Sequence, residues 1–129
     1  MIDENKYNED IKVLNYITED EKELLYKNAK IVLFPSFYEG FGLPIVEAQK
    51  YGVPVITSSN SSMTEINGCN GILVNPYNIN DIKFAINNLI SDIDLYKKYS
   101  KISIENTNKF TWDTCAKKTL EIFNNADKI

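Results

Sequence analysis

Two glutamates in one glycine-containing segment are the residues whose type and spacing best fit a binding site. The segment Pro35–Ala48 reads PSFYEGFGLPIVEA and carries Glu39 and Glu47. Glycine lets a backbone approach a ligand closely, and the amides of Gly40–Leu43 precede a predicted helix start at Pro44, where anionic or oxygen-rich groups bind. A carboxylate accepts hydrogen bonds from two neighbouring hydroxyls, such as those of a ribose. The segment therefore predicts a site for an oxygen-rich ligand that carries a diol.

Each carboxylate also has an ordinary interpretation. Glu47 could merely complement the dipole at the start of its helix, an effect of about 0.3–1 kcal/mol. Glu39 could be a solvated acid in a surface loop. Charge and loop position by themselves leave these alternatives open.

The elements around this segment alternate between short apolar runs and helical patterns. Runs that are apolar throughout, such as Ile31–Phe34, are typical of strands buried on both faces of a parallel sheet. The predicted strands are Ile11–Tyr16, Ile31–Phe34, Val53–Thr57 and Ile72–Val74. The predicted helices begin at Thr18, Pro44, Asn78, Ile93 and Thr111, and Met63–Asn67 forms one helical turn. This alternation predicts an α/β fold, a Rossmann-like parallel sheet with flanking helices.

In such a sheet, ligands bind beyond the carboxyl ends of the strands. The loops expected to carry function are therefore Ile17–Thr18, Pro35–Leu43, Ser58–Ser62 and Asn75–Asn78. The segment with the two glutamates supplies the second of these loops.

Composition excludes several classes of function. The chain has 129 residues, enough for one domain, and a net charge of −4, which disfavours a nucleic-acid partner. It contains no His, and all 14 basic residues are Lys, so it has no Ser-His-Asp triad, no HExxH zinc site and no arginine fork for phosphate. The thiols Cys69 and Cys115 form no CxxC motif and are expected to be free. No signal peptide or membrane span is predicted, so we expect a cytoplasmic protein.

Pro35–Ala48 resembles the Glu-x7-Glu signature of retaining GT-B-fold glycosyltransferases, the "group 1" family. Glu39 and Glu47 fall at its two acidic positions, with Gly-Phe-Gly-Leu-Pro between them. Weaker matches flank the signature, and the resemblance covers roughly residues 11–123. The flanking matches are Gly52–Ile56, Glu65, Gly71–Val74 and Phe110–Trp112.

The resemblance implies that residues 1–129 form a single, partial C-terminal domain that binds a nucleotide-sugar. Glu39 is implied to be a catalytic residue that holds hydroxyls of the transferred sugar near the reacting carbon, and Glu47 to hold the ribose. No metal or other cofactor is implied. The remaining donor-binding residues that the resemblance implies are Gly40, Phe41, Gly42 and Leu43 at the sugar and diphosphate, and Tyr16 and Ile17 against the base.

The expected function is donor binding in a hexosyltransferase that moves a sugar from a UDP- or GDP-sugar to an acceptor with retention. A saccharide or lipid acceptor is expected to bind to a domain outside this sequence. The family's Arg and Lys pair, which neutralises the departing diphosphate, has no counterpart here, so we expect the chain to be inactive or nearly so alone. The alternatives are a non-enzymatic Rossmann-like interaction or regulatory module, and a fragment of a sugar-nucleotide epimerase.

The sheet order implied by the resemblance, 3-2-1-4-5-6, raises a question about one edge. Strands 1 and 2 would separate Ile11–Tyr16 from Ile31–Phe34, and the sequence lacks them. Ile31–Phe34 would then present unpaired backbone groups. We expect either that Ile11–Tyr16 moves in beside it, or that two chains pair their edges or swap strands as a homodimer. Trp112 is expected to pack in the core or between helices.

Overall fold

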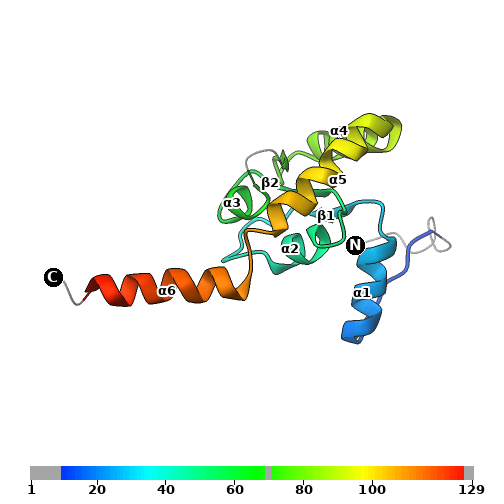
Figure 1. Ribbon diagram of the computed structural model, residues 1–129. Helices are drawn as coiled ribbons and strands as arrows, with labels where there is room; N and C mark the ends of the chain where they lie inside the picture. Colours follow the sequence, from blue (N-terminus) through cyan, green and yellow to red (C-terminus); the bar gives the residue numbers. More distant parts are fainter. Residues whose placement is uncertain (1–9, 69–70, 127–129) are drawn as a thin grey trace.

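A computed structural model describes residues 10–68 and 71–126 of the 129-residue chain (Figure 1). Three parallel strands form one sheet in the order β1-β2-β3, and helices flank it, which confirms the predicted fold class. In chain order the elements are α1 (Glu19–Asn28), β1 (Val32–Phe34), α2 (Leu43–Gln49), β2 (Val55–Ser58), α3 (Met63–Ile66), β3 (Ile72–Val74), α4 (Ile79–Ser91), α5 (Ile93–Thr107) and α6 (Trp112–Ala126).

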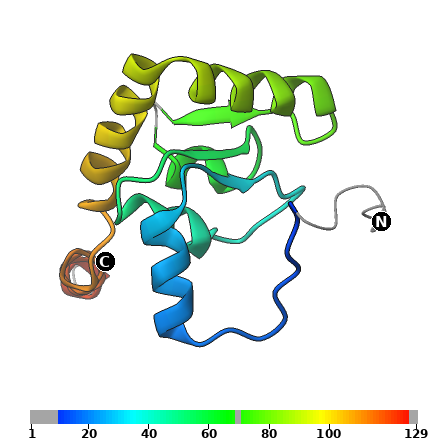
Figure 2. The ribbon, with the colours of Figure 1, turned by 90° about the vertical axis from the view of Figure 1, so that its right-hand side faces the viewer.

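The central strand β2 is buried along its whole length, because helices cover both faces of the sheet. Figure 2 shows α4 on one side of the strands and α2 on the other, with α5 running between the two layers at the end of the sheet. One core cluster gathers around Ile45 and Met63 on the α2 side, and a second around Ile56 and Leu89 on the α4 side. The packed sheet thus fixes the carboxyl ends of its strands, and the loops that follow the strands begin from these fixed positions.

Local sequence signals set the helix starts as predicted. The Thr18 hydroxyl accepts a hydrogen bond from the amide of Glu21, and the Glu21 carboxylate accepts one from the amide of Thr18 at 2.8 Å, which completes a capping box. That backbone hydrogen bond, followed by one from the Thr18 hydroxyl, lowers the pKa of Glu21. Asn78 and Asp92 cap α4 and α5 with their side-chain oxygens, each of which accepts hydrogen bonds from two backbone amides of the first turn.

A buried polar network fixes α2 against α3 and α5. Gln49 Nε2 donates to Asn67 Oδ1 at 2.9 Å, and Asn106 Nδ2 donates to Gln49 Oε1 at 2.7 Å and to the carbonyl of Ile66 at 2.8 Å. Asn67 Nδ2 donates in turn to the carbonyl of Ile72 at 3.1 Å. These side chains are almost completely buried, so the network satisfies polar groups that would otherwise destabilise the core.

The predicted strand at Ile11–Tyr16 is wrong. Its residues form no ladder with any described strand, and Tyr16 is 93% exposed. A strand is stable only where its backbone groups find a partner, and this segment pairs with none of the three described strands. Strand β1 therefore forms an edge of the described sheet, with Leu33 45% exposed, and the predicted local rearrangement does not occur. Pairing between two chains stays a prediction.

Helix α6 stands away from the rest of the chain (Figure 1). Trp112 at its start is 89% exposed, so the prediction that it packs in the core or between helices is also wrong. Leu120, Ile122 and Phe123 are exposed as well, and they leave an apolar face of α6 uncovered within the described chain. None of the described helices is both long enough and apolar enough to cross a membrane.

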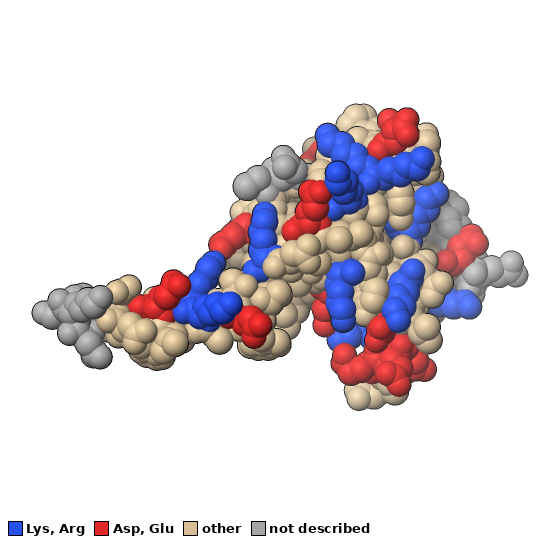
Figure 3. All heavy atoms as spheres, in the orientation of Figure 1, with Lys and Arg blue, Asp and Glu red and all other residues tan. Residues whose placement is uncertain are grey.

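The charged side chains of both signs are spread over several elements. Figure 3 shows acidic side chains gathered over one end of α1, where Glu19, Asp20 and Glu21 form the first turn of the helix. Lysine side chains lie over the neighbouring helices on the same face. Among the described residues, some lysines pair with acids one helical turn away on the same helix, as Lys27 of α1 does with Glu23 at 2.7 Å.

Candidate functional site: a loop between two strands and two carboxylates

The loop after β1 is held in place by the loop after β2. Polar side chains of the second loop donate hydrogen bonds to backbone carbonyls of the first. The bonds run from Ser58 Oγ to Ser36 O (2.6 Å), from Asn60 Nδ2 to Phe37 O (2.8 Å), and from Ser62 Oγ to Glu39 O (2.8 Å) and Phe41 O (3.1 Å). These four carbonyl oxygens, which would repel an anionic ligand, are thereby occupied by hydrogen bonds to the second loop.

The backbone amides of the same loop differ from its carbonyls, because they are available as hydrogen-bond donors. No described residue accepts a hydrogen bond from the backbone amides of Gly40, Phe41, Gly42 or Leu43. Unpaired donors on successive residues suit an oxygen-rich or anionic ligand. Helix α2 has only seven residues, so an anion at this loop would depend on these amides and not on a long helix dipole.

The two glycines of this loop differ in what they require. Gly42 is buried at φ +96°, a left-handed conformation, and a Cβ there would lie 3.0 Å from Ile45 Cδ1. Gly40 is exposed, and a Cβ there would meet nothing within 4 Å. Gly42 is therefore needed for the fold, whereas Gly40 leaves room for a ligand.

Glu39 is anchored through its backbone, and no described residue forms a hydrogen bond or an ion pair with its carboxylate. Its amide donates to Ser61 Oγ at 3.3 Å and its carbonyl accepts from Ser62. Ser61 itself has φ 47°, a conformation uncommon outside glycine, so the second loop is strained where it meets Glu39. Nearby, the rings of Phe37 and Tyr77 stack with their centroids 4.8 Å apart, which ties the loops after β1 and β3 together.

Glu47 lies in a cleft of about 180 Å³ between α1 and α2. Its Oε1 accepts a hydrogen bond from Lys22 Nζ at 3.0 Å, and its Oε2 accepts one from the Tyr26 hydroxyl at 3.1 Å. Burial and then the hydrogen bond to Glu47 raise the pKa of Tyr26 to about 12. Hydrogen bonds to Glu19 and then to Glu47 raise the pKa of Lys22. Glu47 thus meets a protonated phenol and an ammonium.

Sequence reasoning missed Lys22 and Tyr26. Their only signal is their spacing of four residues, which places them on one face of α1. Nothing in the sequence says that this face meets Glu47, which follows 25 and 21 residues later.

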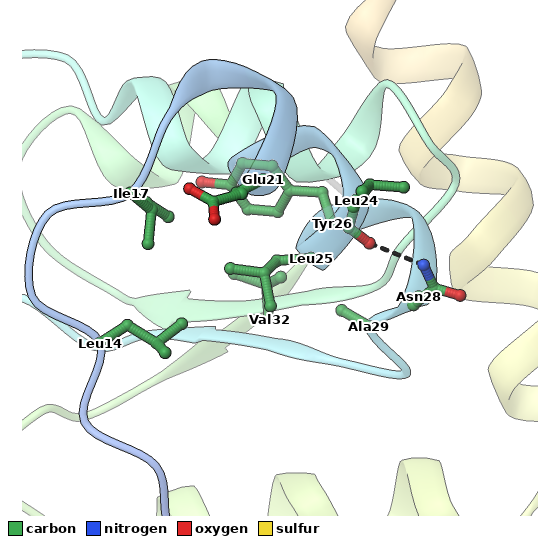
Figure 4. A pocket seen from close by; sticks show the side chains of 9 residues that line it. All are labelled: Leu14, Ile17, Glu21, Leu24, Leu25, Tyr26, Asn28, Ala29 and Val32. Carbon is green, nitrogen blue, oxygen red and sulfur yellow. Dashed lines mark hydrogen bonds between the residues drawn. The ribbon is translucent and has the colours of Figure 1, made fainter.

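Neither Tyr16 nor Ile17 lines the cleft that holds Glu47, and Tyr16 is 93% exposed. Ile17 lines a hollow of about 720 Å³ together with Leu14 and residues of α1 and β1, as Figure 4 shows. In that view Leu25 and Val32 point into the hollow from two different elements. Tyr26 lines both this hollow and the cleft that holds Glu47, so the two spaces adjoin at that side chain.

No metal centre is evident in the part of the chain that the structure describes. Residues 10–68 and 71–126 bring together no group of three or more Cys, Asp or Glu side chains that could hold an ion. Cys115 is free and exposed on α6, and Cys69 lies outside the described residues.

Comparison with known proteins places this loop and helix in a family. The model described as "Glycosyl transferases group 1" matches residues 1–106. The chain belongs to the group 1 glycosyltransferases. The predicted resemblance is therefore confirmed, and the chain is part of a family of transferases, which disfavours a purely non-enzymatic module.

Relatives of this glycosyltransferase chain agree with the assignment. O-antigen chain mannosyltransferase B of Escherichia coli is 32% identical over 113 residues, which cover 88% of this chain and 30% of that protein. An uncharacterised glycosyltransferase of Methanocaldococcus jannaschii is 33% identical over 114 residues, 85% of this chain and 29% of the relative. The chain thus spans less than a third of the length of these relatives.

The fold is also that of solved glycosyltransferases. The sucrose-phosphate synthase of Thermosynechococcus elongatus matches with a TM-score of 0.77 and 25% identity, over 89% of this chain and 30% of that one. A glycosyltransferase of Rickettsia africae matches with a TM-score of 0.69 and 28% identity, over 78% of this chain and 28% of that one.

Proposed function

We propose that this chain is the donor-binding part of a GT-B glycosyltransferase that transfers a sugar from a UDP- or GDP-sugar to an acceptor with retention. The observation that supports this most directly is the loop Gly40–Leu43, whose amides have no described partner. The helix that begins at the end of this loop, α2, carries Glu47 one turn after Leu43.

Each part of the donor has a chemical counterpart in this proposal. The amides of Gly40, Phe41, Gly42 and Leu43 donate to the diphosphate and sugar oxygens, and they stabilise the negative charge that develops on the leaving diphosphate. Glu39 accepts hydrogen bonds from hydroxyls of the transferred sugar, and Glu47 from the ribose diol. Because both carboxylates bind hydroxyl groups and not the diphosphate, their negative charge is compatible with an anionic ligand.

The base is proposed to lie against Tyr16 and Ile17. Support comes from Tyr26, which lines both the hollow at Ile17 and the cleft at Glu47, so that a nucleoside could extend from one to the other. A saccharide or lipid acceptor is proposed to bind to a further part of the enzyme, since the relatives are more than three times as long as the segment they share with this chain. No bound metal is required in this proposal.

The names of the relatives suggest which donors to test. Several E. coli relatives are named mannosyltransferases, and the solved structure with the TM-score of 0.77 is a sucrose-phosphate synthase. We therefore propose a hexosyl donor, with a mannosyl and a glucosyl nucleotide as the first candidates.

Calorimetric titration of the purified chain tests the donor site. We expect UDP or GDP, and at least one of GDP-mannose and UDP-glucose, to bind in the presence of EDTA, without detectable transfer by the 129-residue chain alone. Gly40→Ala should weaken binding about tenfold and leave the melting temperature unchanged, because its methyl group would contact no protein atom and would occupy open space where the ligand is proposed to bind. Absence of binding to every one of these nucleotides would contradict the proposal, and so would full affinity in Gly40→Ala.

We further propose that two copies of this chain associate through α6. Its four large exposed apolar side chains, Trp112, Leu120, Ile122 and Phe123, offer roughly 500 Å² per copy, and roughly 1,000 Å² per pair is the lower bound of specific interfaces. Sedimentation at micromolar concentration should show a dimer that Leu120→Glu dissociates and that Glu121→Lys, on the opposite face of the same helix, preserves. A monomer at these concentrations would contradict the homodimer.

A further inference from the structure

The cleft between α1 and α2 engages both oxygens of one carboxylate. Lys22 Nζ donates to Glu47 Oε1 at 3.0 Å and the Tyr26 hydroxyl donates to Glu47 Oε2 at 3.1 Å. Lys22 is in turn held by Glu19 Oε2 at 2.8 Å. A glutamate on a helix surface would otherwise sample several rotamers, and these two donors from one face of α1 select a single orientation.

Glu47 keeps the capacity to bind a ligand in this orientation. An ionised carboxylate offers about four acceptor positions, and the two hydrogen bonds from α1 use one on each oxygen. The side chains of Lys22 and Glu47 are 31% and 34% exposed, so the remaining positions can be reached from the solvent side of the cleft. One free acceptor position on each oxygen is what two adjacent hydroxyl donors require.

We propose that Lys22 and Tyr26 are positioning residues that hold the Glu47 carboxylate in the orientation in which it accepts both hydroxyls of the ribose of a bound nucleotide. This inference rests on the proposed donor-binding function. It adds that α1 confers selectivity for ribonucleotides over 2′-deoxyribonucleotides. Neither Lys22 nor Tyr26 needs to touch the nucleotide for this effect.

The protonation of the two donors supports this arrangement. The pKa of Tyr26 is raised to about 12 by burial and by its hydrogen bond to Glu47, and that of Lys22 is raised by its acidic neighbours. Both groups therefore carry their protons at neutral pH and donate to Glu47 throughout the range in which nucleotides are titrated.

A merely structural role for these contacts predicts a different result. Ion pairs with this much solvent exposure contribute little to folding stability, so Lys22→Met and Tyr26→Phe should leave the melting temperature close to that of the parent. Orienting a ligand-binding group in advance lowers the cost of binding, so both changes should instead appear in affinity. The quantity to measure is therefore the ratio of ribonucleotide affinity to 2′-deoxyribonucleotide affinity, because a general loss of stability does not alter this ratio.

The test measures binding of UDP or GDP, whichever the parent binds more tightly, and of its 2′-deoxy analogue. We expect the parent to favour the ribonucleotide about tenfold or more. Lys22→Met and Tyr26→Phe should each lower ribonucleotide affinity three- to tenfold and change deoxynucleotide affinity less than twofold. Lys22→Arg should retain the parent's ratio of ribonucleotide to deoxynucleotide affinity, because arginine keeps a cationic donor beside Glu47.

Matched substitutions of a lysine and a tyrosine outside the cleft keep the result specific. Lys27→Met removes another lysine of α1, one that pairs with Glu23, and Tyr96→Phe removes a hydroxyl on α5; both should keep the parent ratio. An unchanged ratio in Lys22→Met and Tyr26→Phe, with a ratio lost in Glu47→Gln, would overturn the positioning role and leave the donor site intact. A parent that binds neither UDP nor GDP would overturn the donor site and this inference together.

Discussion

Replacing Asn106 by Leu is expected to lower the free energy of unfolding by about 3 kcal/mol. The Asn106 amide donates to Gln49 Oε1 at 2.7 Å and to the carbonyl of Ile66 at 2.8 Å, and both acceptors lie in the interior. Leucine has a similar shape but no donor, so two buried oxygens would lose their partner without access to water. Because Gln49 belongs to α2, the change also weakens the attachment of the helix that carries Glu47.

Urea denaturation measures this effect. The control is Asn108→Leu, since Asn108 lies two residues further along, is exposed, and should change the free energy of unfolding by less than about 0.5 kcal/mol. Equal destabilisation by the two substitutions would show that the buried network does not hold α2, α3 and α5 together in the way the hydrogen bonds indicate.

Elements governed by local signals were predictable from the sequence. The capping pair Thr18 and Glu21 starts α1, Asn78 starts α4, and the apolar run Ile72–Val74 gives β3 with its observed bounds. In each case the residues that determine the element lie within it or next to it. The glycine loop after β1 was predictable for the same reason, because its motif is continuous in the chain.

Features that depend on a distant partner could not be predicted. The apolar pattern of Ile11–Tyr16 is compatible with a strand, but no neighbouring strand is available to pair with it. The exposure of Trp112 likewise depends on what α6 packs against, which the spacing of its apolar residues does not specify. The partners of Glu47 follow the same rule, since Lys22 is 25 residues away and belongs to another helix.

Replacing Glu47 by Gln is expected to weaken nucleotide binding about 10- to 100-fold, or about 1.4–2.8 kcal/mol. The ribose diol needs two acceptors, and the amide of Gln offers only one acceptor atom. The other atom is a donor, which would lose the contact if it faced the Lys22 ammonium and would reverse the hydrogen bond if it faced the Tyr26 hydroxyl, so the amide cannot accept from both groups as the carboxylate does.

The same substitution should affect folding much less than binding. The Lys22–Glu47 pair is about one-third exposed on both sides, and such pairs contribute about 0–1 kcal/mol to stability. Parallel calorimetric titration and urea denaturation compare the two losses directly. Glu105→Gln is the control, because Glu105 also pairs with a lysine, Lys101, on the surface of α5 but lies outside the site.

The two measurements together identify the role of Glu47. A binding loss that exceeds the stability loss, with Glu105→Gln unchanged in affinity, is the result expected for a carboxylate that contacts the ribose. Unaltered affinity in Glu47→Gln would remove Glu47 from the donor site and leave it as a surface partner of α1. A large stability loss would mean that its contacts with Lys22 and Tyr26 serve chiefly to pack α1 against α2.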